Sequence, residues 1–415
     1  MLPQYIYKFC LILLVYFTST YSIELSFIFS CITLLLSVSS FINRDIAIGS
    51  IILSVILTIG LISGLNVEYF WRDIIKDFVY FARPIVLLLA AYYCVKRIHS
   101  TTFVFNTVVV LSAFFALKHL FVILVNFSNI DSYVYLRGLG GKQNHIELVG
   151  LVFLFFTPYV TVFKRYRKLV VYIISLSFIL YLSRTMFILL FVFYIAYKGY
   201  MFFNKKFLKG LFVFFLVAIA LGITISSVET NRDSTGFKAF IYKTQNSFSE
   251  VFKPINTKEI VNDRRELWEH WRAYEASKAI EQIEEVGPKA WLVGMGFGAQ
   301  VDLETYVYLD GEKYYEVPSI HNGFVNVLFK TGILGLALYL LFISLIFVNN
   351  QKFKSTPHSI LYNKMLLATS IYMLYNSFVI TGFFRPGEFS IFLFGIWMAT
   401  KVKNERMRIS QPQQV

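Results

Sequence analysis

Residues 169–197 read LVVYIISLSFILYLSRTMFILLFVFYIAY, a stretch in which Arg184 is the single charged side chain. One helix of about 30 residues would be longer than even a tilted membrane span. We therefore expect two spanning helices that meet at Ser183 and Arg184. A cation held this close to a bilayer is costly unless it meets an anion or water, so Arg184 is either a headgroup anchor or a functional residue.

The composition of the whole chain is that of a membrane protein. Of the 415 residues, 57% are apolar and 15% are charged, whereas soluble domains carry about 25% charged residues. The mean hydropathy of +0.61 implies an apolar surface, which a bilayer solvates better than water does. The three cysteines lie in apolar runs, which argues against a disulfide framework or a zinc site. They are Cys10, Cys31 and Cys94.

Hydropathy predicts an all-α polytopic membrane protein with twelve transmembrane helices and a large, partly helical loop outside the membrane. The first apolar run has no small-residue cleavage site after it, so we interpret it as an uncleaved span. The predicted spans are 4–22, 24–42, 46–65, 78–95, 103–126, 145–163, 168–183, 185–203, 207–228, 320–348, 360–381 and 386–401. The corresponding regions are 1–228 (nine helices), 229–319 (outer loop), 320–402 (three helices) and 403–415 (tail).

Lysine and arginine fall on alternate short loops, which predicts that those loops and both termini are cytoplasmic. The segment 229–318 is then outside. It carries 11 basic and 16 acidic residues, a net charge of −5, while the rest of the chain carries 28 and 9, a net charge of +19. The overall charge of +14 therefore comes mostly from the basic loops that set orientation in the membrane. This removes the main argument for a nucleic-acid-binding protein.

The outer loop contains one regular segment, residues 264–285, with apolar residues near helical spacing. Asp263 is expected to cap this helix and Gly287 to end it. Arg264 and Arg265 would occupy the first turn, where free backbone N–H groups favour an anion. The two arginines either hold an anion or are solvated surface residues. Aromatic residues of the loop either stack on sugars or pack the loop; they include Trp268, Trp271, Tyr306, Tyr308, Tyr314 and Tyr315.

Residues 294–298, GMGFG, resemble a nucleotide-binding loop, but no strand and helix flank them in the required order. We expect these glycines to allow close packing of the loop instead.

Beyond the loop, the chain re-enters the membrane with a polar stripe. Asn322, Asn326 and Lys330 recur every four residues, so they share one helix face, which should contact protein or water. An imidazole exchanges protons near neutral pH. His321, at the outer end of the stripe, is thus either a general base or a hydrogen-bonding anchor.

These motifs resemble the bacterial O-antigen polymerase and O-antigen ligase family. The most specific part is residues 321–336, HNGFVNVLFKTGILGL. Arg264 with Trp268, the glycine run at 294–298, and Arg184 within Ser-Arg-Thr resemble the segments upstream of that signature. The resemblance covers roughly positions 140–340, and the part of the chain before it matches only as generic spans.

The resemblance implies a GT-C-like glycosyltransferase that is independent of metals and has no cofactor. The donor would be an undecaprenyl-diphosphate-linked oligosaccharide, used at the outer face of the cytoplasmic (inner) membrane. A chain-length regulator and a flippase would be its protein partners, with the bilayer around it and no nucleic acid.

The resemblance also implies roles for individual residues. His321 would take the proton of the acceptor hydroxyl, while Arg184 and Arg264 would hold the donor diphosphate. Arg265 replaces an apolar residue that is usual in the family, so which arginine of the pair binds stays open. Supporting residues would be Asn322, Asn326 and Asn144.

Three functions fit this sequence, and we rank a polymerase of lipid-linked repeat units first, because an acidic outer loop suits a dedicated glycan repeat. The alternative within the family is a ligase that moves the finished glycan onto lipid A core. A flippase for the same lipid-linked glycan would need cations deep in several spans. Only Lys118 and Lys330 are candidates for such depth, and the other charges gather at one face.

Overall fold

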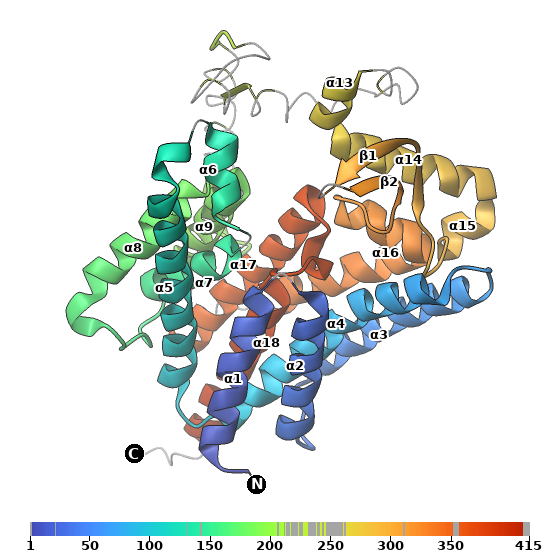
Figure 1. Cartoon of the computed structure of the whole chain (residues 1–415). Helices are drawn as coiled ribbons and strands as arrows, with labels where there is room; N and C mark the ends of the chain where they lie inside the picture. Colours follow the sequence, from blue (N-terminus) through green and yellow to red (C-terminus); the bar gives the residue numbers. More distant parts are fainter. Residues whose placement is uncertain are drawn as a thin grey trace.

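The computed structural model shows a bundle of helices with a small cap at one end (Figure 1). It describes residues 2–205 except 21, 131 and 142, short pieces between 207 and 260, and 263–409 except 310, 311 and 352–356. The bundle helices in these ranges are α1 (Gln4–Ser19), α2 (Ile23–Ser37), α3 (Arg44–Leu65), α4 (Trp71–Arg97), α5 (Thr101–Val125), α7 (Asn144–Phe156), α8 (Arg167–Leu180), α9 (Arg184–Tyr197), α16 (Gly323–Asn349), α17 (Pro357–Val379) and α18 (Ser390–Ile409). The short helix α6 (Tyr133–Leu139) precedes α7.

Each of these eleven bundle helices coincides with one of the twelve segments predicted from hydropathy. The remaining segment, 207–228, lies largely outside the described residues. Among the described helices, α3, α4, α5 and α16 are long and apolar enough to cross a membrane, and α1, α2, α7 and α9 are shorter apolar helices. The protein is therefore an almost entirely helical membrane protein, and the number of twelve spans stays a prediction.

The interruption expected at Ser183 and Arg184 is present. α8 ends at Leu180, and α9 begins at Arg184. Between them Leu182 has a φ of 48°, in the left-handed region that reverses the chain direction. Because of this turn, Arg184 starts a helix, where it lies at the end of the apolar segment and not in its middle.

The start of α1 and the end of α18 lie near each other, at the end of the bundle opposite the cap (Figure 1). Gln4 at the start of α1 donates to the carbonyl of Arg97 at 2.9 Å and accepts from the backbone N–H of His99. Lys403, near the end of α18, donates to the carbonyl of Ile98 at 2.8 Å. The first bundle helix thus begins on the side of the bundle where the last one ends, as expected for an even number of spans.

The cap consists of three helices and a hairpin. Its elements are α13 (Arg264–Glu269), α14 (Trp271–Val286), α15 (Pro288–Val293), and the antiparallel strands β1 (Val301–Leu309) and β2 (Glu312–Val317). Asp263 caps α13 as expected, because its carboxylate accepts from the N–H of Glu266. The single helix predicted at 264–285 bends at His270 into α13 and α14. The antiparallel hairpin of β1 and β2 corrects the all-α prediction.

The glycine run after α15 attaches the cap to the bundle. Gly294, Gly296 and Gly298 have φ values between 79° and 93°, and a Cβ atom on any of them would lie within 2.8 Å of a neighbouring atom. The N–H of Phe297 donates to the carbonyl of Gly60 at 2.9 Å, and its ring lies against Gly60 of α3. The prediction of close packing is confirmed, and the packing partner is an N-terminal helix.

A buried ion pair reinforces this attachment. Lys330 of α16 donates to the carboxylate of Asp77 on α4 and to the carbonyl of Ala299, both at 2.5 Å. The same carboxylate accepts from the N–H of Gly298 at 2.8 Å. Two residues later α16 breaks at Gly332, whose φ is 66°, because α15 packs against it there. The polar stripe therefore faces protein, one of the two environments expected for it.

Candidate active site

His321 lies in the turn before α16, paired with a carboxylate from the cap. Its Nδ1 is 2.8 Å from Oε2 of Glu275, and the same oxygen accepts from the backbone N–H of His321 at 3.2 Å. The His321 side chain is 49% exposed, while that of Glu275 is 1% exposed. A carboxylate at Nδ1 favours the tautomer with its proton on that nitrogen, which leaves Nε2 as an acceptor on the open side.

Glu275 is held by the buried face of α14. Trp271 and Ala279, one turn to either side on the helix, are buried in the cap core. The hydroxyl of the neighbouring Tyr274 donates to the carbonyl of Leu303 on β1. Burial raises the pKa of Tyr274 to about 12, so this hydroxyl keeps its proton over the physiological pH range. The hairpin thereby fixes the rotation of α14 that points Glu275 at His321.

The turn that carries His321 is fixed on its other side by the bundle. Asn326 Oδ1 accepts from the N–H of Ile320 at 3.2 Å, and Thr381 donates to the carbonyl of Ile320 at 3.1 Å. Gly323, directly after the site, donates to the carbonyl of Ile380 at 2.9 Å. The imidazole is thus presented by a rigid turn between the cap and the α17–α18 connection, as a positioned base requires.

Two arginines from different elements, Arg184 at the start of α9 and Arg272 of α14, interact electrostatically with the Tyr375 hydroxyl of α17. Arg272 and Glu275 are three residues apart on α14, and residues at this spacing share a helix face. α14 therefore carries both the carboxylate paired with His321 and an arginine whose charge acts on Tyr375.

Arg264 and Arg265 lie on α13, on the opposite side of His270 from Glu275. The Arg264 guanidinium is 4.2 Å from the centre of the Tyr306 ring, and Lys313 Nζ is 4.0 Å from the same ring. Both cations thus gather on an aromatic face of the hairpin. The structure therefore places Arg264 with the hairpin and does not bring it to His321 in the described part of the chain. The side chain of Arg265 lies outside the described residues.

The three asparagines predicted as supporting residues occupy helix starts. Asn322 caps α16, because its Oδ1 accepts from the N–H groups of Phe324 and Val325, and Asn326 holds the Ile320 turn. Asn144 is the first residue of α7. The next residue, His145, is buried, and its Nδ1 lies 2.6 Å from the Tyr372 hydroxyl, one turn from Tyr375. Asn322 and Asn326 therefore act on the His321 turn itself.

Sequence reasoning missed Glu275 and Arg272. Glu275 follows Trp271 by four residues, so it falls on the apolar face that the same reasoning assigned to this helix. A carboxylate on an apolar face predicts a buried polar partner, and this signal was available. Arg272 had no comparable signal, since its electrostatic interaction with Tyr375 depends on the tertiary fold and not on any local sequence pattern.

Part of the chain matches the model of a known family. Residues 169–340 match the family model described as O-antigen ligase. The match covers less than half of the chain and shows a similarity of this segment to that family. The resemblance seen in the sequence is thereby confirmed. A comparison with curated proteins gives no match.

The O-antigen ligase segment contains most of the candidate site. It runs from α8 through the cap to the first turns of α16 beyond Gly332, and so includes the paired His321 and Glu275 together with Arg184, Arg264 and Arg272. Asp77 and Tyr375 lie outside it, on α4 and α17. The family segment thus contains the candidate site residues, and residues of the flanking helices contact them.

Proposed function

We propose that the protein polymerises undecaprenyl-diphosphate-linked oligosaccharide repeat units at the outer face of the cytoplasmic membrane. The observation that carries this proposal is the pairing of His321 with the buried Glu275. Glu275 belongs to α14, the helix that also carries Arg272. A partly exposed imidazole held by a carboxylate is the arrangement of a general base. The fold expected for such an enzyme is GT-C-like, with twelve spans and both termini cytoplasmic.

In the proposed reaction, Nε2 of His321 takes the proton from a sugar hydroxyl of the acceptor. The hydroxyl oxygen forms a bond to the anomeric carbon of the donor, and the bond from that carbon to undecaprenyl diphosphate breaks. The imidazolium that forms is stabilised by Glu275 at Nδ1. A positioned base of this kind contributes about 10²–10⁴-fold to the rate.

The leaving diphosphate gains negative charge as the glycosidic bond breaks, and fixed cations stabilise that charge. Arg184 and Arg272 are our candidates for this role beside Tyr375, and Arg264 or Arg265 would bind further along the lipid-linked donor. Guanidinium groups bind phosphate oxygens with two parallel hydrogen bonds. In this proposal the arginines take the place of the metal ion that many sugar transferases use.

A ligase is the second candidate, because the matching family model is described as O-antigen ligase. The two reactions share a donor and differ in the acceptor, which is a lipid-linked repeat unit for a polymerase and lipid A core for a ligase. Lys330, one of two deep cations that a flippase would use, is engaged by Asp77. The family match favours the enzymes over a flippase.

The deciding experiment supplies the purified protein with undecaprenyl-diphosphate-linked repeat units in the absence and presence of lipid A core. A polymerase produces a ladder of lipid-linked chains without the core, whereas a ligase produces a glycosylated core only when the core is added. The matched control is His321→Ala, which should give neither product. Movement of lipid-linked repeats across a liposome membrane without chain growth would contradict both enzyme assignments.

A further inference from the structure

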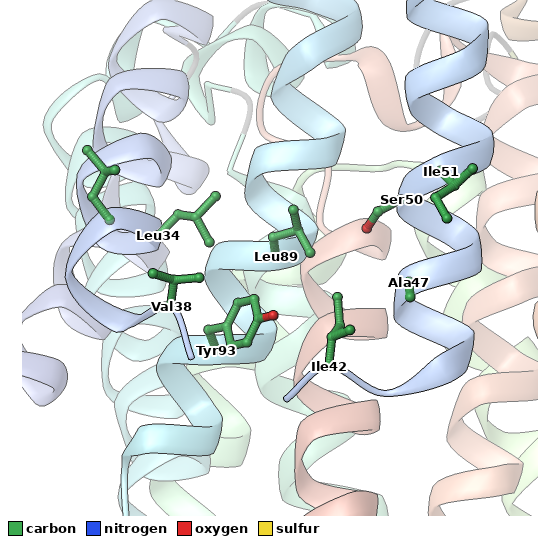
Figure 2. A pocket seen from close by; sticks show the side chains of 9 residues that line it. Leu34, Val38, Ile42, Ala47, Ser50, Ile51, Leu89 and Tyr93 are labelled. Atoms are coloured by element: carbon green, nitrogen blue, oxygen red, sulfur yellow. The ribbon is translucent and has the colours of Figure 1, made fainter. Parts of the chain in front are cut away.

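A groove opens between α2 and α3 and has α4 as its floor. It has a volume of about 490 Å³. Its lining residues, shown in Figure 2, are Leu34, Leu35, Val38, Ile42, Ala47, Ser50, Ile51, Leu89 and Tyr93. Seven of these nine side chains are hydrocarbon. Because α3 and α4 are candidate membrane spans, the groove faces the bilayer interior, where an apolar chain fills it better than water does.

The other two lining residues place hydroxyl groups in the groove. Figure 2 shows the Ser50 oxygen and the Tyr93 hydroxyl pointing into the gap between α3 and α4. Ser50 Oγ is buried and has no hydrogen-bond partner among the described residues. An unsatisfied hydroxyl in an apolar medium is energetically costly. A ligand with an acceptor oxygen at this depth would remove that cost, and a plain hydrocarbon would not.

Two cations continue the groove at the end of the bundle opposite the cap. Arg44 precedes Ala47 by three residues on α3, and Lys96 follows Tyr93 by three residues on α4, so each lies one turn beyond a lining residue on the same face. Lys96 Nζ is 5.7 Å from the centre of the Tyr93 ring and donates to Ser39 Oγ at 3.2 Å. This places its charge at the mouth of the groove.

We propose that this groove binds one acyl chain of an anionic phospholipid from the membrane leaflet opposite the cap. Two cations lie beyond the end of a lining that contains hydroxyl groups and hydrocarbon. A phospholipid likewise carries its phosphate beyond its ester groups and acyl chains. The phosphate lies at the two cations, an ester oxygen accepts from the two hydroxyl groups, and the chain lies between Leu34, Ile51 and Leu89. The site is separate from the glycosyl-transfer site and does not depend on its assignment.

The test uses the purified full-length protein in detergent micelles, titrated with dioleoylphosphatidylglycerol. A lipid that binds the folded state raises the unfolding temperature with concentration, and native mass spectrometry should show one retained phospholipid. Dioleoylglycerol, which lacks the phosphate, should bind at least about tenfold more weakly. Arg44→Gln should reduce that preference several-fold. Equal affinity for the two lipids would overturn the proposal.

Groove variants locate the site. Ala47→Trp fills the groove and should abolish both retention and stabilisation by the phospholipid. Val110→Trp is the matched control, because Val110 is an exposed residue of α5 outside the groove. If Ala47→Trp does not fold, the double variant Ser50→Ala and Tyr93→Phe decides. It keeps the groove open and should weaken phosphatidylglycerol binding several-fold.

Two further results would contradict the proposal. One is unchanged phosphatidylglycerol binding in the groove variants. The other is undecaprenyl phosphate displacing phosphatidylglycerol at a lower concentration than phosphatidylglycerol itself needs, which would assign the groove to a polyprenyl chain.

Discussion

Oε2 of Glu275 lies within 3.2 Å of two nitrogens of one residue, the backbone N–H and Nδ1 of His321. A single buried carboxylate thus fixes both the position of the turn and the orientation of the ring. Because Glu275 belongs to the cap and His321 to the start of α16, the base is complete only when the cap is docked. The cap is therefore part of the catalytic unit that we propose.

Replacing Glu275 with Gln should lower the rate of chain growth about 10²–10⁴-fold, because the imidazolium loses its counter-charge. Glu275→Asp should recover part of the rate, since the charge returns at a greater distance. The measurement is polymer formed per unit of membrane-inserted protein. Glu284→Gln is the control, as Glu284 is exposed on the same helix. Equal loss in both variants would mean that Glu275 has only a structural role.

His321→Ala should remove polymer formation while the protein remains in the membrane at normal abundance. The reason is that the acceptor hydroxyl loses its base, whereas the turn is still held by Asn326 and Thr381. Polymer length on gels and protein abundance on blots report the two effects separately. His99→Ala serves as the comparison, because His99 lies at the end of the bundle opposite the cap. Normal polymer in the His321 variant would refute the proposed base.

Arg272→Lys and Arg184→Lys should each weaken use of the lipid-linked donor about tenfold or more, because an ammonium group cannot form the paired hydrogen bonds of a guanidinium. The KM for the lipid-linked donor should rise more than the KM for the acceptor. Lys289→Met removes an exposed cation from the cap and should change neither. Comparing Arg264→Ala with Arg265→Ala will show which of that pair binds the donor.

Lys330→Met should destabilise the protein by about 3–5 kcal/mol, because Asp77 would be left buried without its cation. Adding Asp77→Asn should restore much of that loss, since the amide oxygen can still accept from the N–H of Gly298. Thermal unfolding of the purified variants measures both steps. Additive losses in the double variant would contradict the ion-pair interpretation.

Gly60→Ala should undock the glycine run from α3, because the new methyl group would lie 2.2 Å from the Phe297 ring. Overpacking of this kind costs about 1–3 kcal/mol, and faster proteolysis of the cap would report it. Gly138→Ala is the matched control, since no atom lies within 4 Å of a Cβ atom there. An unaltered cap in the Gly60 variant would show that α3 can shift to accommodate it.

The helices could be predicted from the sequence because hydropathy and length decide which segments enter a bilayer, and the break at Arg184 follows from the same length argument. His321 could be selected as a candidate base from its place at the end of a polar stripe, and this role stays a prediction. The hairpin was not predictable, because its exposed aromatic residues gave no clear alternation between buried and solvated faces. The partners of Lys330 and His321 were not predictable either, since Asp77 and Glu275 lie 253 and 46 residues away.

The docking of Phe297 between Gly60 and Gly64 has a consequence for the modularity of this chain. The N-terminal helices look like interchangeable membrane anchors, yet α3 and α4 provide the surface against which the glycine run of the family segment packs. Transplanting residues 169–340 onto the spans of another protein would remove the glycine run from the α3 surface against which it packs. We therefore expect that specificity can be exchanged between related proteins in two ways. Either the whole chain is exchanged, or the cap surface alone is exchanged while residues 294–298 stay packed against their own α3.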